Sequence, residues 1–190
     1  MAFYSLHLPL SDAEARMLRA GDTVELTGTM YTGRDAAHKR LIALLEEGKP
    51  LPVDLAGQTI YYVGPAPASP GHAVGSAGPT TSYRMDAYTP ALLSLGLRVM
   101  IGKGRRSQEV QAAMQKTGAV YLGAVGGAAA LIARSIKESQ VIAYPDLGPE
   151  AIHLFTVEKF PAIVLMDSVG GNLYESGPAA YARFDKDEIL

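Results

Sequence analysis

Cysteine is absent from the 190-residue chain. Without a thiol, the chain itself cannot form a disulfide scaffold, a thiol nucleophile, a Cys-ligated zinc site or a Cys-ligated iron–sulfur cluster. Histidine is also scarce, because only four residues occur and none has the HExxH spacing of a zinc site. We therefore expect no metal site within this chain.

Charge is the second shortage. Charged residues make up 19% of the chain and the net charge is −2, which gives no electrostatic footprint for nucleic acid or an anionic membrane. No apolar run approaches the ~18–20 residues of a membrane span, and the N-terminus lacks the basic and apolar regions of a signal peptide. These absences predict a soluble, cytoplasmic protein that binds neither nucleic acid nor membranes.

Apolar residues are plentiful at 48%, enough for a packed core, and the length predicts a single domain over residues 1–190. Helical and strand patterns alternate along the chain, which indicates the α/β class with mixed sheets and flanking helices. The expected helices cover 11–19, 35–47, 90–95, 107–117 and 127–138, and the expected strands cover 23–28, 59–63, 97–101, 119–122, 141–143, 152–158 and 162–166. Residues 64–82 show no periodicity and predict a long loop of the kind that carries sites, and the tail from about residue 174 is expected to be a loop.

The segment YTGRDAAH, residues 31–38, joins an expected strand to an expected helix. Thr32 and Asp35 fit a capping box, which places Arg34 in the first helical turn. A cation there opposes the helix dipole unless an anion binds between the guanidinium and the backbone N–H groups. An ordinary surface arginine is the alternative, and His38 is expected to be a helix-face histidine rather than a catalytic one.

The segment GPTTSYRMD, residues 78–86, places three hydroxyl groups and the Arg84 guanidinium after the long loop. Such donors suit a carboxylate or a phosphate, whose oxygens accept several hydrogen bonds. The alternative is a turn in which the hydroxyls cap a helix and Arg84 pairs with Asp86 or remains solvated.

Lys103 lies between two glycines at the carboxyl end of an expected strand, in the segment IGKGRR. Ligands of α/β sheets bind outside the carboxyl ends of the strands, although this segment is not a Walker A loop. An ordinary solvated turn is the alternative. The glycine-rich segment 123–131 and His72 are better explained by close packing of a helix on a strand and by a solvated loop histidine, respectively.

Three separate strand-end segments thus offer Arg34, Arg84 and Lys103. This set suits a ligand with several negative charges, such as a dicarboxylate. No pair of carboxylates and no Ser–His–Asp order stands out beside these cations. The sequence therefore resembles one half of an active site.

Six segments carry a family resemblance: TGRDAAHKRL, YYVGP, GPTTSYRMD, IGKG, VGGAAAL and EKFPAIVLMDSVGGNLY. Together they resemble the β subunit of class I, iron–sulfur-dependent fumarases and the related L-tartrate dehydratase β subunit, from about residue 5 to about residue 180. The resemblance implies a swivelling β/β/α domain. It also implies an α subunit, in an α2β2 assembly, whose three cysteines hold a [4Fe–4S] cluster.

The resemblance also implies roles for individual residues. Arg34, Thr81, Arg84 and Lys103 match family residues that bind the substrate, and Thr80 matches the catalytic threonine proposed to transfer a proton. The implied activity is that of a hydro-lyase that reversibly hydrates fumarate to (S)-malate, a step of the tricarboxylic acid cycle. An L-tartrate dehydratase or another hydroxy-diacid dehydratase is the enzyme alternative, and an anion-binding or assembly module is the non-enzyme alternative.

Overall fold

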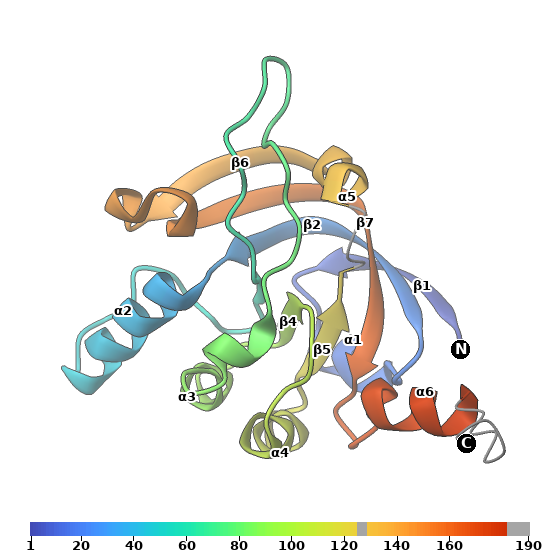
Figure 1. Cartoon of the computed structure of the whole chain (residues 1–190). Helices are drawn as coiled ribbons and strands as arrows, with labels where there is room; N and C mark the ends of the chain where they lie inside the picture. The colour runs from blue at the N-terminus through green and yellow to red at the C-terminus, as the bar shows by residue number, and fades with distance from the viewer. Residues whose placement is uncertain (125–128, 182–190) are drawn as a thin grey trace, which may run out of the picture.

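The computed structural model describes residues 1–124 and 129–181. Helices and strands alternate along the chain, as the sequence predicts (Figure 1). In chain order the elements are β1 (Phe3–Leu8), α1 (Asp12–Met17), β2 (Thr23–Thr32), α2 (Asp35–Glu46), β3 (Thr59–Tyr61), the 3-10 helix η1 (Ser82–Met85), α3 (Thr89–Ser94), β4 (Val99–Gly102), α4 (Gln108–Thr117), β5 (Val120–Gly123), α5 (Ala129–Ser135), β6 (Ile136–Ala143), the 3-10 segment η2 (Pro145–Glu150), β7 (Ile152–Met166) and α6 (Leu173–Tyr181).

The strands form one mixed sheet in the order β1-β2-β3-β4-β5-β7-β6. The first five run parallel to their neighbours, whereas β7 is antiparallel to β5, β6 and β2. Because β7 pairs with both β5 and β2, the sheet closes on itself. The α/β class with mixed strand directions and flanking helices is confirmed, with one sheet in place of several.

Two clusters of buried side chains lie on opposite faces of the sheet. Neighbouring residues of a strand point to opposite faces, so Val99 and Ile101 of β4 join one cluster while Met100 joins the other. In the same way, Tyr121 of β5 belongs to the second cluster, which also contains side chains of α2, α3 and α4. Tyr121 therefore faces the helices.

Several elements follow directly from local sequence signals. Ser11 and Glu14 form the predicted capping box at the start of α1, where the Ser11 hydroxyl accepts from the Glu14 N–H at 3.2 Å. The Ser107 hydroxyl caps α4 by accepting the Val110 N–H, and Gly118 ends that helix with a left-handed φ of 77°.

Three expectations about elements are wrong. The two strands expected at 152–158 and 162–166 are one strand, β7, because pairing with β2 extends over both of them, from Leu154 to Ile163. The helix expected over 127–138 ends at Ser135, and the chain enters β6, an antiparallel partner of β7. The described part of the tail expected to be a loop forms α6, since Asn172 Oδ1 accepts the Tyr174 N–H at 3.0 Å and satisfies a donor of its first turn. Residues 182–190 of this tail lie outside the described part of the chain. Strand β1 is an addition that no expected element covers.

Residues 64–80 form the long loop that the sequence predicts, without helix or strand. Figure 1 shows this segment as an arm that projects past β6 and β7. Backbone hydrogen bonds from Ala66 N–H to Ser76 O and from Gly75 N–H to Ala66 O, both 2.9 Å, hold its two sides together. No helix in the described ranges reaches the length and apolarity that crossing a bilayer requires.

Candidate active site

The predicted site residues lie at one edge of the sheet. Strands β2, β3 and β4 are adjacent and parallel, so their carboxyl ends meet at the same edge. Arg34 follows β2, and Lys103 follows β4 directly. Thr81 forms a backbone bridge with Lys103, and the Thr80 N–H donates to Tyr62 O at 2.7 Å. The structure thus brings the arginine, the lysine and the two threonines to one place.

Asp35 links the two arginines. Its Oδ1 lies 2.8 Å from Arg84 Nε, and its Oδ2 lies 4.0 Å from Arg34 Nε. Arg34 Nη2 also lies 3.5 Å from Glu150 Oε1. The alternative pairing of Arg84 with Asp86 is therefore wrong, and both guanidinium groups converge on a carboxylate of the protein.

The start of α2 differs from the predicted capping box. Thr32 is still paired with Tyr61 in the sheet, so it lies in β2 instead of capping the helix. Arg34 is the N-cap residue and makes no side-chain cap, whereas Asp35 is the first helical residue. The carboxylate of Glu150, far along the chain, accepts the Ala36 N–H at 3.1 Å and satisfies one donor of that helix end.

The three consecutive hydroxyl groups have different surroundings. The Ser82 side chain is fully buried, whereas Thr80 and Thr81 are half-buried. Ser82 Oγ accepts the Lys103 N–H at 3.1 Å and lies 2.8 Å from the Tyr121 hydroxyl. Ser82 therefore serves the local backbone structure, and the two threonines remain as the partly accessible hydroxyls beside exposed Lys103.

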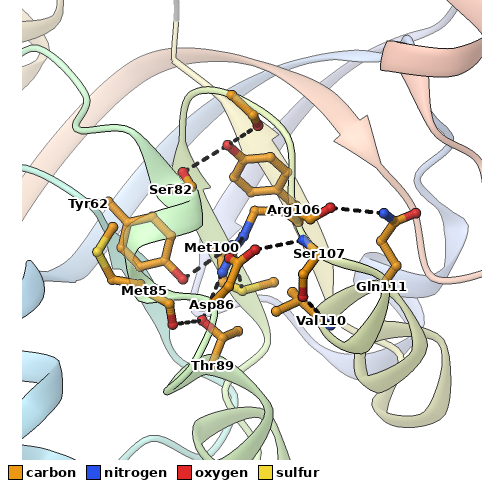
Figure 2. A network of polar contacts seen from close by, with 12 residues as sticks. Tyr62, Ser82, Met85, Asp86, Thr89, Met100, Arg106, Ser107, Val110 and Gln111 are labelled. Atoms are coloured by element: carbon orange, nitrogen blue, oxygen red, sulfur yellow. Dashed lines mark hydrogen bonds and ion pairs between the residues drawn. The ribbon is translucent and has the colours of Figure 1, made fainter.

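Arg106 is not part of a solvated turn, because its side chain is completely buried. Its Nε lies 2.6 Å from Asp86 Oδ1, and its Nη2 donates to the Thr89 hydroxyl at 2.8 Å. Figure 2 shows Arg106 in the middle of this network, below Ser82 and beside Tyr62. The network packs η1, α3 and the turn before α4 together under the site.

Three residues that support the site were not predicted from the sequence: Arg106, Asp86 and Tyr121. One signal was present for Tyr121, because it lies in a strand that is otherwise apolar and a buried phenol needs a hydrogen-bond partner. No comparable signal in the sequence distinguishes Arg106 from Arg105, which is exposed.

A cavity of about 320 Å³ lies next to Lys103 at the same edge of the sheet. Its lining consists of Gly102, Lys103, Gly123, Ala124, Ile163, Leu165 and Tyr174. The glycine-rich segment after β5 continues from this wall, but its residues 125–128 lie outside the described part of the chain.

Two of the histidines lie on the elements that the sequence predicts for them. His38 is on α2, fully buried, with Nδ1 2.8 Å from Arg34 O. His72 is exposed on the arm. Among residues 1–124 and 129–181, no three His, Asp or Glu side chains are grouped so that they could hold a metal ion.

Comparison with known proteins gives consistent matches. Residues 4–177 match the family described as fumarase C-terminus. Over 90% of its length the chain is 43% identical to the anaerobic class I fumarate hydratase of Escherichia coli, and over 80% it is 45% identical to the aerobic enzyme of Salmonella typhimurium. These matches cover 32% and 27% of the two relatives, so the chain spans about a third of their length. Over 87% of its length it is 38% identical to a putative L(+)-tartrate dehydratase subunit beta of Methanocaldococcus jannaschii, of which it covers 88%.

Proposed function

The chain belongs to the fumarase C-terminus family, and we propose that it is the β subunit of a hydro-lyase that reversibly hydrates fumarate to (S)-malate. The observation that supports this proposal is the meeting of three cations and two threonines at one edge of the sheet. Arg34, Arg84 and Lys103 supply the charges that a dicarboxylate requires. Thr81 is paired with Lys103, and Thr80 precedes it in the chain.

The proposed chemistry suits this arrangement. Dehydration of malate removes a weakly acidic proton from C3, and negative charge then grows toward the neighbouring carboxylate. Cations that are fixed at that carboxylate stabilise the transition state more than the ground state. We assign the binding of the substrate carboxylates to Arg34, Arg84 and Lys103, and a further substrate contact to Thr81.

Thr80 is proposed to transfer the C3 proton. A free threonine hydroxyl is a poor base, so its pKa must be lowered in the closed site by a neighbouring cation. The exposed ammonium of Lys103 is the candidate cation, because Lys103 pairs with the adjacent residue Thr81.

The rest of the enzyme is proposed to lie in a separate α subunit, within an α2β2 assembly. The chain spans only about a third of the fumarate hydratases that it matches, which leaves most of those proteins without a counterpart here. We propose that the α subunit holds the [4Fe–4S] cluster, since this chain has no cysteine and its described side chains do not fit as a ligand set. The single domain over residues 1–190 and the cytoplasmic location remain predictions.

A dehydratase for L-tartrate is the second candidate. It is favoured by one observation, that a relative matched over 88% of its own length is named a putative L(+)-tartrate dehydratase subunit beta. The two substrates share both carboxylates, so the same cations would bind either one.

Anaerobic co-purification of the tagged full chain with its partner tests both candidates. The complex is assayed for malate-to-fumarate conversion and, in parallel, for dehydration of L-tartrate, with Arg84→Ala as the matched control. Activity on malate that depends on Arg84 supports the proposal, and activity on tartrate alone supports the second candidate. A chain that binds dicarboxylates but has no partner and no activity would instead be an anion-binding or assembly module.

A further inference from the structure

Ser82 and Lys103 are joined by two reciprocal hydrogen bonds. The Ser82 N–H donates to Lys103 O at 2.9 Å, and the Lys103 N–H donates to Ser82 Oγ at 3.1 Å. Gly102 makes this close approach feasible, because a Cβ at that position would collide with Ser82 Oγ. The backbone that carries Lys103 is therefore held by a side chain from η1.

The hydroxyl of Tyr121 extends this connection. It lies 2.8 Å from Ser82 Oγ and 2.9 Å from Gly104 O. Burial raises the pKa of the Tyr121 phenol, so the hydroxyl keeps its proton.

The directions of these bonds follow from the available protons. A carbonyl oxygen only accepts, so the single proton of Tyr121 goes to Gly104 O. Ser82 must then donate its own proton to Tyr121, while its oxygen accepts from Lys103. The result is a directed chain from the Lys103 N–H through two hydroxyls to the Gly104 carbonyl, and it fixes the backbone on both sides of Lys103.

Arg106 holds the Tyr121 ring in place. Its guanidinium carbon lies 5.1 Å from the centre of the Tyr121 ring and 5.3 Å from that of Tyr62. The ion pair with Asp86 and the bond to Thr89 prevent the guanidinium from moving. Tyr121 and Tyr62 thus share one cation, but only the Tyr121 hydroxyl bonds to the Ser82–Lys103 pair.

We propose that Tyr121 is a positioning residue for the reaction, acting through Ser82 on the backbone of Lys103 so that the ammonium reaches the substrate carboxylate in one fixed orientation. The inference rests on the proposed function of Lys103 in substrate binding. It adds a residue from β5 whose side chain need not touch the substrate.

The test compares Tyr121→Phe with Tyr62→Phe in the complete enzyme complex. Both variants lose one buried hydroxyl next to Arg106, and Tyr62→Phe keeps the backbone carbonyl that accepts from Thr80. We expect Tyr121→Phe to lower kcat/KM about tenfold, the loss that one hydrogen bond explains, and Tyr62→Phe to change it by less than about twofold. In a Lys103→Ala background, Tyr121→Phe should have no further effect, because its action passes through Lys103. Equal losses in the two tyrosine variants, or an undiminished Tyr121→Phe effect without Lys103, would overturn the proposal.

A second readout does not depend on activity. Hydrogen exchange of the full chain, followed at the Lys103 amide, should become about tenfold faster in Tyr121→Phe and stay unchanged in Tyr62→Phe. The Gly104 amide serves as an internal reference, because it donates to the Tyr174 hydroxyl at 2.9 Å. Ser82→Ala removes the Lys103 acceptor directly and replaces Tyr121→Phe if that variant does not fold. Faster exchange in Tyr121→Phe alone, in a complex that has no activity on any dicarboxylate, would refute the proposed function. It would still support the positioning of the Lys103 backbone by Tyr121. Unchanged exchange at the Lys103 amide would refute the positioning role.

Discussion

Acid should weaken the fold through His38, the buried histidine of α2. Its ring lies edge-on to Tyr62, with 5.4 Å between ring centres, and its Nδ1 lies 2.8 Å from Arg34 O. Burial lowers the pKa of His38 to about 4 from its ordinary value of 6.5, so the ring is neutral near pH 7. Because the Arg34 carbonyl only accepts, Nδ1 carries the proton and donates it.

The size and sign of the effect follow from this pKa. In the unfolded chain His38 binds a proton below about pH 6.5, whereas in the folded chain it does so only near pH 4. Between these values the unfolded state holds more protons, so the free energy of unfolding falls as the pH falls. At about 1.4 kcal/mol per pH unit, the loss attributable to His38 is about 3 kcal/mol, and it is complete below about pH 4.

Urea titrations of the full chain from about pH 7.5 to about pH 4 measure this loss. His38→Asn is the matched variant, because its side-chain amide keeps a donor for Arg34 O and does not titrate. Other groups, including His153, whose pKa burial also lowers, contribute equally to both proteins. We expect the stability advantage of the wild type over the variant to shrink by about 3 kcal/mol across this range. Two curves that stay parallel would show that His38 is not held neutral by the fold.

Three further predictions concern the site and its support. Arg84→Ala should lower kcat/KM of the complex by about 100-fold or more, because a charge at the substrate carboxylate is lost. Steady-state kinetics would detect this loss, and near-wild-type kinetics would show that Arg84 does not bind the substrate. Thr80→Ala should lower kcat with little change in substrate binding, and if kcat survives, Thr80 only positions the substrate. Asp86→Ala should lower the free energy of unfolding by about 3–5 kcal/mol, because it leaves the buried guanidinium of Arg106 without its counter-charge. Adding Arg106→Met should restore much of that loss in urea titrations, whereas additive losses would contradict the explanation.

The meeting of Arg34 and Lys103 could be predicted from the sequence. Each follows a recognisable strand, and the carboxyl ends of neighbouring parallel strands share an edge. The family resemblance indicated the same residues, but it did not predict that Asp35 lies between Arg34 and Arg84. That contact joins two segments about fifty residues apart, and local patterns carry no information on it.

Long-range contacts also explain why some elements were predicted wrongly from the sequence. Glu150 supplies the helix end of α2 with an acceptor from more than a hundred residues away, so the local Thr32 signal was misleading. The break expected within β7 falls at Lys159, where a positive φ of 50° interrupts the regular strand without ending it. Pairing with β2 on both sides of Lys159, and the bond from the Lys159 N–H to the Thr27 hydroxyl at 3.1 Å, maintain the strand through this irregularity.

The position of β7 determines when this protein can finish folding. Strands β1 to β5 all precede residue 124, yet the sheet closes only when Ile152–Met166 pairs with β2 and β5. During synthesis, one edge of β2 therefore stays unpaired until a strand about 130 residues later has left the ribosome. Contacts of such long range make folding slow, and an exposed strand edge can pair with another chain in the meantime. Production of the chain should consequently benefit from conditions that slow aggregation during translation.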